Sequence, residues 1–430
     1  MPQHTLQIHA ARRLHGTLKV PGDKSISHRY AMIGAIARGT TSVTHLAPGA
    51  DVASTVACMR AMGVRIETDG AGGMRVHGRG RRGLQAPAAA LDAGNSGTTM
   101  RLMSGLVAAH AFRSTIFGDE SLSRRPMRRV IDPLTAMGAR ISSNDGRAPL
   151  EIEGGDLSGI EWTTPVASAQ IKSSILLAGL HARGRTTVHE PLGTRDHTER
   201  MFRGYGIELS INGLSVSIEG GQEGTAPAGT HPVPGDPSSA AIWASAAAAM
   251  PGSSVTLENV CLNPFRVGFV SALERMGAAI TITSRDEVGG EAVGTLHIEH
   301  GSHQDTRIVP AEVPALIDEL PVLAARAAYG GRLEVSGAGE LRVKESDRIS
   351  ALVAGFRTLG VDAEELPDGF IITGGRRPTG GTVDAAGDHR LVMAFTLIGL
   401  GASGPTTITG AEAVAVSYPA FEKDLATLTQ

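Results

Sequence analysis

A pattern of about 70 residues recurs along this chain of 430 residues and limits its possible folds more than any other feature. Amphipathic stretches end in a bulky residue and a glycine, then continue into an apolar stretch, as in "ACMRAMGVRIE" and "SALERMGAAIT". A glycine after the last turn of a helix takes the left-handed conformation without strain. The sequence therefore predicts helix C-caps at Gly63, Gly138, Gly206, Gly277 and Gly360.

A second series alternates with the first and predicts strands. Its members start with glycine and are rich in β-branched residues: "GTTSVTHL", "GRTTVHEP", "GSSVTLEN", "GRLEVSG" and "GPTTITG". Ahead of most of them lies a helical stretch with little polar surface, such as "IKSSILLAGLHA". A helix that is apolar all round has to be covered on all sides. We therefore expect an α/β protein in which these helices are buried and the sheets and amphipathic helices lie outside them.

The length of the chain predicts two domains, because it exceeds what one hydrophobic core usually organises. About six repeats over two domains give three repeats each. One stretch, "GQEGTAPAGTHPVPGDPSS" at 221–239, is the clear Pro/Gly-rich break near the middle of the chain. By contrast, "SRDEVGGEAVG" is typical of a hairpin turn or surface loop.

Composition excludes several classes of protein. The formal net charge of −3 and the 41% hydrophobic content do not suit a protein that binds nucleic acid or a membrane surface. Cys58 and Cys261 are the two cysteines, too few for a disulfide framework and consistent with a reducing compartment. The first residues lack the apolar core of a signal peptide, and no apolar run suits a membrane span. We expect a cytoplasmic protein.

Polar and cationic residues gather where the buried helices are predicted to start. In "PGDKSISHR" we expect Ser25 or Ser27 to begin a helix, beside Lys24 and Arg29. If the buried helices of a domain are parallel, their positive N-terminal ends converge on an anion-binding site. Two such ends facing each other would form a cleft for a substrate with several phosphates or carboxylates, and the cations available for it are Lys24, Arg29, Arg101, Arg125, Arg195, Lys344, Arg348 and Arg390.

Single motifs leave alternatives open. In "LRVKESDRI", Lys344 and Arg348 would share one face of a helix with Glu345 beside them, which is also an ordinary surface pattern. Asp318 in "LIDELP" is in a position that is more often a helix N-cap than an acid, and His389 is as consistent with a satisfied histidine as with a proton carrier. There is no zinc-ligand spacing, catalytic triad order, complete phosphate loop or dinucleotide fingerprint, so we expect no metal and no cofactor.

Seven motifs, taken in order, resemble those of the 5-enolpyruvylshikimate-3-phosphate (EPSP) synthase family. They are "PGDKSISHR", "GNSGTTMRL", "SLSRRPM", "SAQIKSSILLAGL", "TRDHTERM", "VKESDR" and "GDHR", and the resemblance runs from about residue 15 to 425. It implies a two-domain enolpyruvyl transferase-like fold with six βαβαββ-type units, three per domain, and buried parallel helices. One domain would comprise 1–22 plus 237–430 and the other 23–236, with the active-site cleft between them.

The resemblance also implies a reaction. The enolpyruvyl group of phosphoenolpyruvate would pass to the 5-hydroxyl of shikimate 3-phosphate with release of phosphate, a step towards chorismate and the aromatic amino acids. Both substrates are polyanions, as the cationic cleft requires. They would be the only partners, bound by a monomer that needs no cofactor. We also expect closure on shikimate 3-phosphate, because like-charged helix ends that face each other repel until an anion bridges them.

Roles carry over from the family position by position. Lys24 would contact both substrates, Asp318 would take the proton of the 5-hydroxyl, and Glu345 would act as the acid at C3. The remaining residues implied for shikimate 3-phosphate are Ser25, Arg29, Ser168, Ala169, Gln170, Arg195 and Lys344. Those implied for phosphoenolpyruvate are Gly97, Arg125, Gln170, Arg348 and Arg390, with Asn95 and His389 as further candidates.

The chain departs from the common family pattern at two places. Leu102 stands where many members have proline, and Val416 and Ser417 stand where many have a lysine that contacts phosphoenolpyruvate. These features resemble a divergent subgroup in which tolerance of glyphosate is associated with alanine at the position of Gly97. Glycine there favours sensitivity to glyphosate.

Two other functions remain as alternatives. A UDP-N-acetylglucosamine enolpyruvyl transferase would share the fold, but it would show Lys-Asn in place of Lys24-Ser25 and a cysteine on a mobile loop. A non-catalytic protein that binds phosphorylated metabolites would have no reason to keep Asp318 and Glu345.

Overall fold

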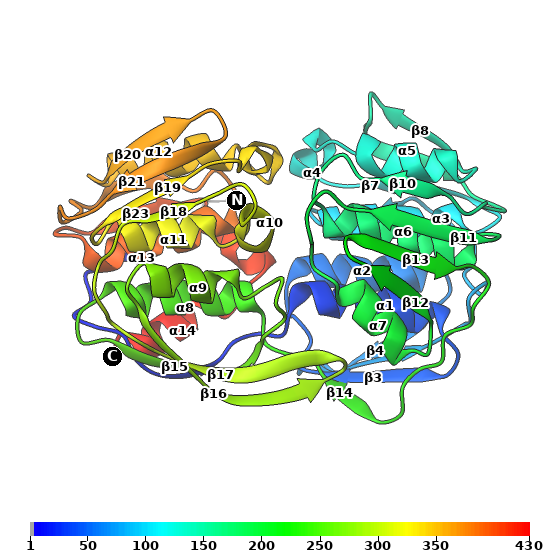
Figure 1. Cartoon of the computed structure of the whole chain (residues 1–430), viewed down its shortest axis with the longest axis horizontal. Helices are drawn as coiled ribbons and strands as arrows, with labels where there is room; N and C mark the ends of the chain where they lie inside the picture. Colours follow the sequence, from blue (N-terminus) through cyan, green and yellow to red (C-terminus); the bar gives the residue numbers. More distant parts are fainter. Residues whose placement is uncertain (1–3) are drawn as a thin grey trace. The chain divides into compact units, whose positions relative to one another are not determined.

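The structure, a computed structural model, describes residues 4–430, except for the side chains of residues 284 and 285. It divides into two compact units (Figure 1). Unit 1 comprises residues 1–21, 234–286 and 292–430, and unit 2 comprises residues 22–233 and 287–291. The sequence predicted the divisions at 22/23 and 236/237 and did not foresee that residues 287–291 group with unit 2.

Unit 2 consists of three copies of one βαβαββ arrangement. In each four-stranded sheet the first strand pairs in parallel with the second, and a hairpin completes the sheet. The first copy contains β14 (Thr230–Pro232), α1 (Lys24–Ile36), β3 (Thr40–Thr44), α2 (Ala50–Ala61), β4 (Arg65–Thr68) and β5 (Met74–His77). The second contains β6 (Leu91–Asp92), α3 (Gly97–Ala108), β7 (Arg113–Phe117), α4 (Glu120–Arg124), α5 (Arg128–Ala136), β8 (Arg140–Asn144) and β9 (Arg147–Glu153). The third contains β10 (Glu161–Thr163), α6 (Ala169–His181), β11 (Arg185–His189), α7 (His197–Gly204), β12 (Leu209–Asn212) and β13 (Ser215–Glu219).

Unit 1 repeats the arrangement, with an incomplete last copy. Its first copy contains β2 (His15–Lys19), α8 (Pro237–Ala249), β15 (Ser254–Cys261), α9 (Gly268–Arg275), β16 (Ala279–Val288) and β17 (Glu291–Glu299). The second contains β18 (Thr306–Ile308), α10 (Val313–Leu316), α11 (Leu320–Ala327), β19 (Arg332–Val335), η1 (Gly339–Val343), α12 (Arg348–Thr358), β20 (Asp362–Leu366) and β21 (Gly369–Thr373). The third contains β22 (Gly381–Asp384), α13 (His389–Gly401), β23 (Thr406–Thr409), η2 (Ala411–Val416) and α14 (Phe421–Leu428), and β1 (Thr5–Ile8) completes its sheet.

The predicted helix ends and buried helices are confirmed. The five glycines of the repeat all have positive φ, between 75° and 113°, and each follows an amphipathic helix. The helices α1, α3 and α6 of unit 2 and α8, α11 and α13 of unit 1 are almost entirely buried. In α8 every residue is buried, which its Ala-rich sequence permits because small side chains allow close packing.

Two copies take their first strand from a distant part of the sequence. The strand β14 pairs with β3, so that Thr230 lies opposite Ser42. The strand β2 pairs with β15, so that His15 lies opposite Ser254. The first sheet of unit 2 therefore takes a strand from the end of residues 22–233, and the first sheet of unit 1 takes one from the N-terminal segment that precedes unit 2 in the sequence. These pairings leave no local signal in the sequence.

Candidate active site

The three buried helices of unit 2 run parallel, as the contacts at both of their ends show. At the N-terminal ends Gln170 Nε2 of α6 donates to Thr98 Oγ1 of α3 at 2.9 Å. At the C-terminal ends Arg82 donates to the carbonyls of Ala109 and His181, at 2.9 and 3.1 Å. The Arg79 amide donates to Ala35 O at the end of α1. The positive ends of the three helix dipoles therefore converge, and the side chain of Arg82 and the backbone amide of Arg79 donate to carbonyls at the negative ends.

The first helix begins one residue before the predicted serines. Asp23 is the N-cap and its carboxylate accepts from the amide of Ile26 at 2.8 Å, so the expected start at Ser25 or Ser27 is wrong. An aspartate cap is consistent with a positive helix end. Lys24 becomes the first residue of the helix, and its Nζ lies 2.9 Å from Asp51 Oδ2 at the start of α2.

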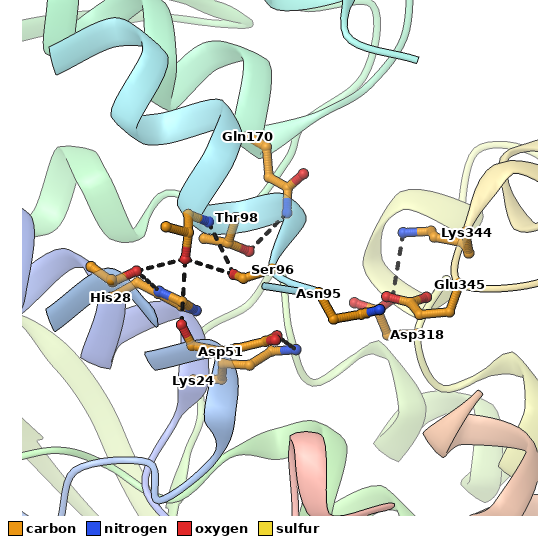
Figure 2. A network of polar contacts seen from close by, with 12 residues as sticks. Lys24, His28, Asp51, Asn95, Ser96, Thr98, Gln170, Asp318, Lys344 and Glu345 are labelled. Atoms are coloured by element: carbon orange, nitrogen blue, oxygen red, sulfur yellow. Dashed lines mark hydrogen bonds and ion pairs between the residues drawn. The ribbon is translucent and has the colours of Figure 1, made fainter. Parts of the chain in front are cut away.

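Near Lys24, a chain of buried side chains links the starts of α1, α2 and α3 (Figure 2). His28 Nδ1 lies 2.7 Å from Thr55 Oγ1, which lies 2.7 Å from Thr99 Oγ1. Thr99 in turn donates to Ser96, the N-cap of α3, at 2.8 Å. Burial, together with the charges of Lys24 and Arg29, lowers the pKa of His28 well below its ordinary value, so its ring is neutral.

The start of α3 is crowded by two guanidinium groups. A Cβ at Gly97 would lie 2.8 Å from Arg101 Nη1 and 3.3 Å from Arg125 Nη1. Arg101 donates to Gln170 Oε1 at 2.6 Å, and Arg125 donates to Asn95 Oδ1 at 3.0 Å. Glycine at this position leaves room for both cations.

Arg29 of α1 is buried, with 3% of its surface exposed. Its guanidinium donates to Thr198 Oγ1 at 2.7 Å, to Ser173 Oγ at 2.8 Å and to Ser25 O at 2.8 Å. Burial lowers the pKa of Arg29 to about 10, opposed by carboxylates that include Glu199 and Asp23.

The other predicted residues of this half lie at the starts of α6 and α7. Ser168 caps α6 and accepts from the amide of Ile171, and Ala169 is the first residue of that helix. Arg195 is half-buried and lies two residues before α7.

In unit 1, Arg348 is the centre of a second cluster. Its side chain is 1% exposed; Nε donates to Asp388 Oδ2 at 2.8 Å and Nη2 to Glu345 Oε2 at 2.6 Å. Burial opposes ionisation, but the charges of Asp388 and Glu345 outweigh it and raise the pKa of Arg348. Asp388 caps α13 and accepts from the amide of Arg390 at 2.9 Å. The starts of α12 and α13 are thereby joined.

The geometry around Asp318 differs from what the motifs suggested. Asp318 is not a helix cap, because α11 begins at Leu320 with Glu319 at the N-cap. Its Oδ1 lies 3.6 Å from Lys344 Nζ and 3.9 Å from Arg348 Nη1 (Figure 2 shows the Lys344 contact). The expected shared helical face of Lys344 and Arg348 is wrong as well, since α12 starts at Arg348 and Lys344 is extended backbone. Tertiary packing brings the two cations to the same carboxylate.

The predicted residues thus form one cluster in each unit. Lys24, Gly97, Arg125, Gln170 and their neighbours lie at the helix starts of unit 2, and Asp318, Lys344, Glu345, Arg348, His389 and Arg390 lie together in unit 1. Sequence reasoning missed Asp51, His28 and Asp388 as partners of these residues. Acidic residues at helix starts were the available signal for Asp51 and Asp388. Val416 ends η2 and Ser417 follows it.

Neither a metal cluster nor a membrane span is found in the described part of the chain. Among residues 4–430, no three His, Cys, Asp or Glu side chains are grouped so that they could hold a metal ion. Within the same residues, no helix combines the length and apolarity needed to cross a bilayer.

Comparisons with known proteins agree with one another. The family model described as EPSP synthase (3-phosphoshikimate 1-carboxyvinyltransferase) matches residues 8–425. A 3-phosphoshikimate 1-carboxyvinyltransferase of Acidithiobacillus ferrooxidans is 49% identical over 415 residues, covering 96% of this chain and 95% of the relative. One of Alkalilimnicola ehrlichii is 51% identical over 411 residues, with coverage of 95% and 92%. The structure of EPSP synthase from Acinetobacter baumannii matches with a TM-score of 0.88 at 43% identity, covering 99% of this chain and 98% of the other.

Proposed function

The chain belongs to the EPSP synthase family, and we propose that it transfers the enolpyruvyl group of phosphoenolpyruvate to the 5-hydroxyl of shikimate 3-phosphate, releasing phosphate. The observation that carries the proposal is the combination of cationic helix starts with carboxylates among them. Asp318 lies within 4 Å of two cations, and Glu345 accepts a hydrogen bond from one of them. Anion binding alone would not need these two carboxylates.

In the proposed reaction the 5-hydroxyl attacks C2 of phosphoenolpyruvate while C3 gains a proton. Asp318 takes the hydroxyl proton, and its carboxylate lies 3.6 Å from Lys344 Nζ and 3.9 Å from Arg348 Nη1. Glu345 gives the proton to C3, and the attack on C2 with this protonation forms a tetrahedral ketal phosphate. Glu345 then takes a proton back from C3 as the C–O bond to phosphate breaks, and the enolpyruvyl ether and inorganic phosphate leave.

The proposed ligands of each substrate are helix starts and cations. For shikimate 3-phosphate they are Lys24, Ser25, Arg29, Ser168, Ala169, Gln170, Arg195, Asp318 and Lys344. For phosphoenolpyruvate they are Lys24, Gly97, Arg125, Gln170, Arg348 and Arg390, with Asn95 and His389 near the same helix starts. Each set draws on residues of both units of one chain, so we propose that the protein acts as a cytoplasmic monomer.

The test is phosphate release from the purified protein with phosphoenolpyruvate and one of two acceptors. Release with shikimate 3-phosphate alone is expected. Release with UDP-N-acetylglucosamine instead would make the protein an enolpyruvyl transferase of the other kind. Tight binding of shikimate 3-phosphate without release in either case would favour a binding protein.

The carboxylate roles are tested by amide variants. Asp318→Asn and Glu345→Gln should each lower kcat by about 100-fold or more while shikimate 3-phosphate still binds. The exposed Asp362 of β20 offers a control, since Asp362→Asn makes the same change of charge on the surface. Unchanged kcat in either active-site variant would contradict its proposed role.

A further inference from the structure

The hairpin formed by β16 and β17 ends in a buried carboxylate. Its turn contains Gly289 and Gly290, both with positive φ, and residues 287–291 belong to unit 2. Glu291 follows the turn and is 3% exposed. Burying an ionised carboxylate is costly unless cations or hydrogen-bond donors surround it. The partners of Glu291 therefore indicate what the hairpin tip does.

Those partners lie on the first turn of α7. Glu291 Oε1 lies 2.6 Å from Nδ1 of His197, which is itself 1% exposed. Glu291 Oε2 lies 3.6 Å from Arg200 Nε, and Arg200 also donates to Gly290 O at 2.9 Å. On the other side of the turn, a Cβ at Gly289 would lie 2.7 Å from Tyr30 Oη of α1, so the turn is closely packed.

The start of α7 is held by side chains from outside the helix, by Glu291 on the hairpin and by Lys172 and Ser173 of α6, which contact Glu199 and Thr198. Asp196 is at the N-cap but makes no side-chain cap hydrogen bond; its carboxylate accepts from Arg200 Nε at 2.8 Å instead. A helix start without a side-chain cap lacks a contribution of about 1 kcal/mol. The hairpin tip contacts the same turn from outside the helix.

This turn carries residues of the proposed shikimate 3-phosphate site. Arg195 directly precedes Asp196, and Thr198 accepts the 2.7 Å hydrogen bond from Arg29 Nε. A displacement of the turn would move Arg195 and remove a fixed partner of Arg29. Gly97 and Arg125, which are proposed for phosphoenolpyruvate, lie on other elements: Gly97 begins α3, and Arg125 follows α4 and donates to Asn95 Oδ1 at 3.0 Å.

We infer that Glu291 is a positioning residue for the shikimate 3-phosphate half of the site, acting through His197 and Arg200 on Arg195 and Arg29. The inference rests on the proposed function for its substrate, but the positioning itself is a property of the protein without ligand. Loss of the carboxylate charge weakens the hold on α7 and leaves the phosphoenolpyruvate residues in place.

The experiment compares Glu291→Gln with Glu287→Gln, which makes the same change at an exposed position of the same tip. Glu291→Gln should raise KM for shikimate 3-phosphate about tenfold, with KM for phosphoenolpyruvate and kcat each changed less than about twofold. Glu287→Gln should change none of them. Glu291→Asp, which keeps the charge on a shorter side chain, should recover part of the loss.

Hydrogen exchange of the ligand-free protein separates this inference from the proposed function. The amides of residues 196–200 should exchange faster in Glu291→Gln than in the natural protein or in Glu287→Gln, and His197→Asn should have the same effect. Unchanged exchange there, or equal increases in both KM values, would overturn the inference. Failure of the natural protein to release phosphate with shikimate 3-phosphate would overturn the proposed function, and the exchange result would still decide the positioning.

Discussion

Replacing Lys172 by methionine should destabilise unit 2 strongly and in a pH-dependent way. Lys172 Nζ lies 2.7 Å from Glu190 Oε2 and 2.7 Å from Glu199 Oε1, and all three side chains are at most 4% exposed. Burial opposes the charge on the lysine, but the two glutamates outweigh it and raise the pKa of Lys172. The cluster joins α6 to the segment before α7 and to α7 itself.

The magnitude follows from the proton that the variant has to bind. Without Lys172, two buried carboxylates face each other, and the folded state is accessible only if one is protonated. Protonating a carboxyl with an ordinary pKa of about 4.3 costs about 4.4 kcal/mol at a pH of about 7.5, and about 1.6 kcal/mol at a pH of about 5.5. In the variant the folded-state pKa lies above the unfolded one, so the lost stability is partly regained as pH falls.

Urea unfolding followed by circular dichroism at both pH values measures this effect. Lys172→Met should lose about 4 kcal/mol relative to the natural protein at the higher pH and about 2 kcal/mol at the lower. The control is Arg183→Met, because the 2.9 Å pair of Arg183 with Asp156 is 74% and 69% exposed and should contribute less than about 0.5 kcal/mol. A loss below about 1.5 kcal/mol for Lys172→Met, or an equal loss at both pH values, would refute the reasoning.

Three further predictions concern the site and the core. Gly97→Ala places a Cβ 2.8 Å from Arg101 Nη1 and should raise KM for phosphoenolpyruvate about tenfold or more. Inhibition curves should show that glyphosate inhibits the natural protein more strongly than this variant. Asp51→Asn removes the charge partner of Lys24 and should lower kcat/KM by about 10- to 100-fold in steady-state assays, whereas an unchanged kcat/KM would show that Lys24 needs no fixed partner. Burial lowers the pKa of His181 to about 3. As the pH falls below about 6.5, the unfolded chain binds a proton that the folded protein does not bind. The free energy of unfolding therefore decreases by about 1.4 kcal/mol per pH unit. Urea unfolding of His181→Asn should not show this decrease in the free energy of unfolding at low pH. An identical pH dependence in the variant and the natural protein would contradict the lowered pKa of His181.

Much of the fold could be predicted because its signals are local. A glycine that ends a helix, such as Gly63 or Gly277, acts through its own φ angle, and both have the predicted conformation. The apolar helices are recognisable because every residue of a stretch such as α8 has to suit a buried environment. Predictions that depended on which residue starts a helix were less accurate, since Asp23 competes successfully with Ser25 and Ser27 for the cap of α1.

The sequence by itself determined the repeat, the buried helices and which residue types stand at their starts. Tertiary structure decided which of these residues meet: Lys24 pairs with Asp51, and Arg348 with Asp388, 40 residues further along the chain. It also decided that β14 and β2 complete distant sheets, and that the predicted hairpin turn brings Glu291 to His197, 94 residues away in sequence. The physical reason is the distance along the sequence over which each effect acts. Periodicity and capping act over a few residues, whereas a buried ion pair exists only where packing has already removed both groups from water.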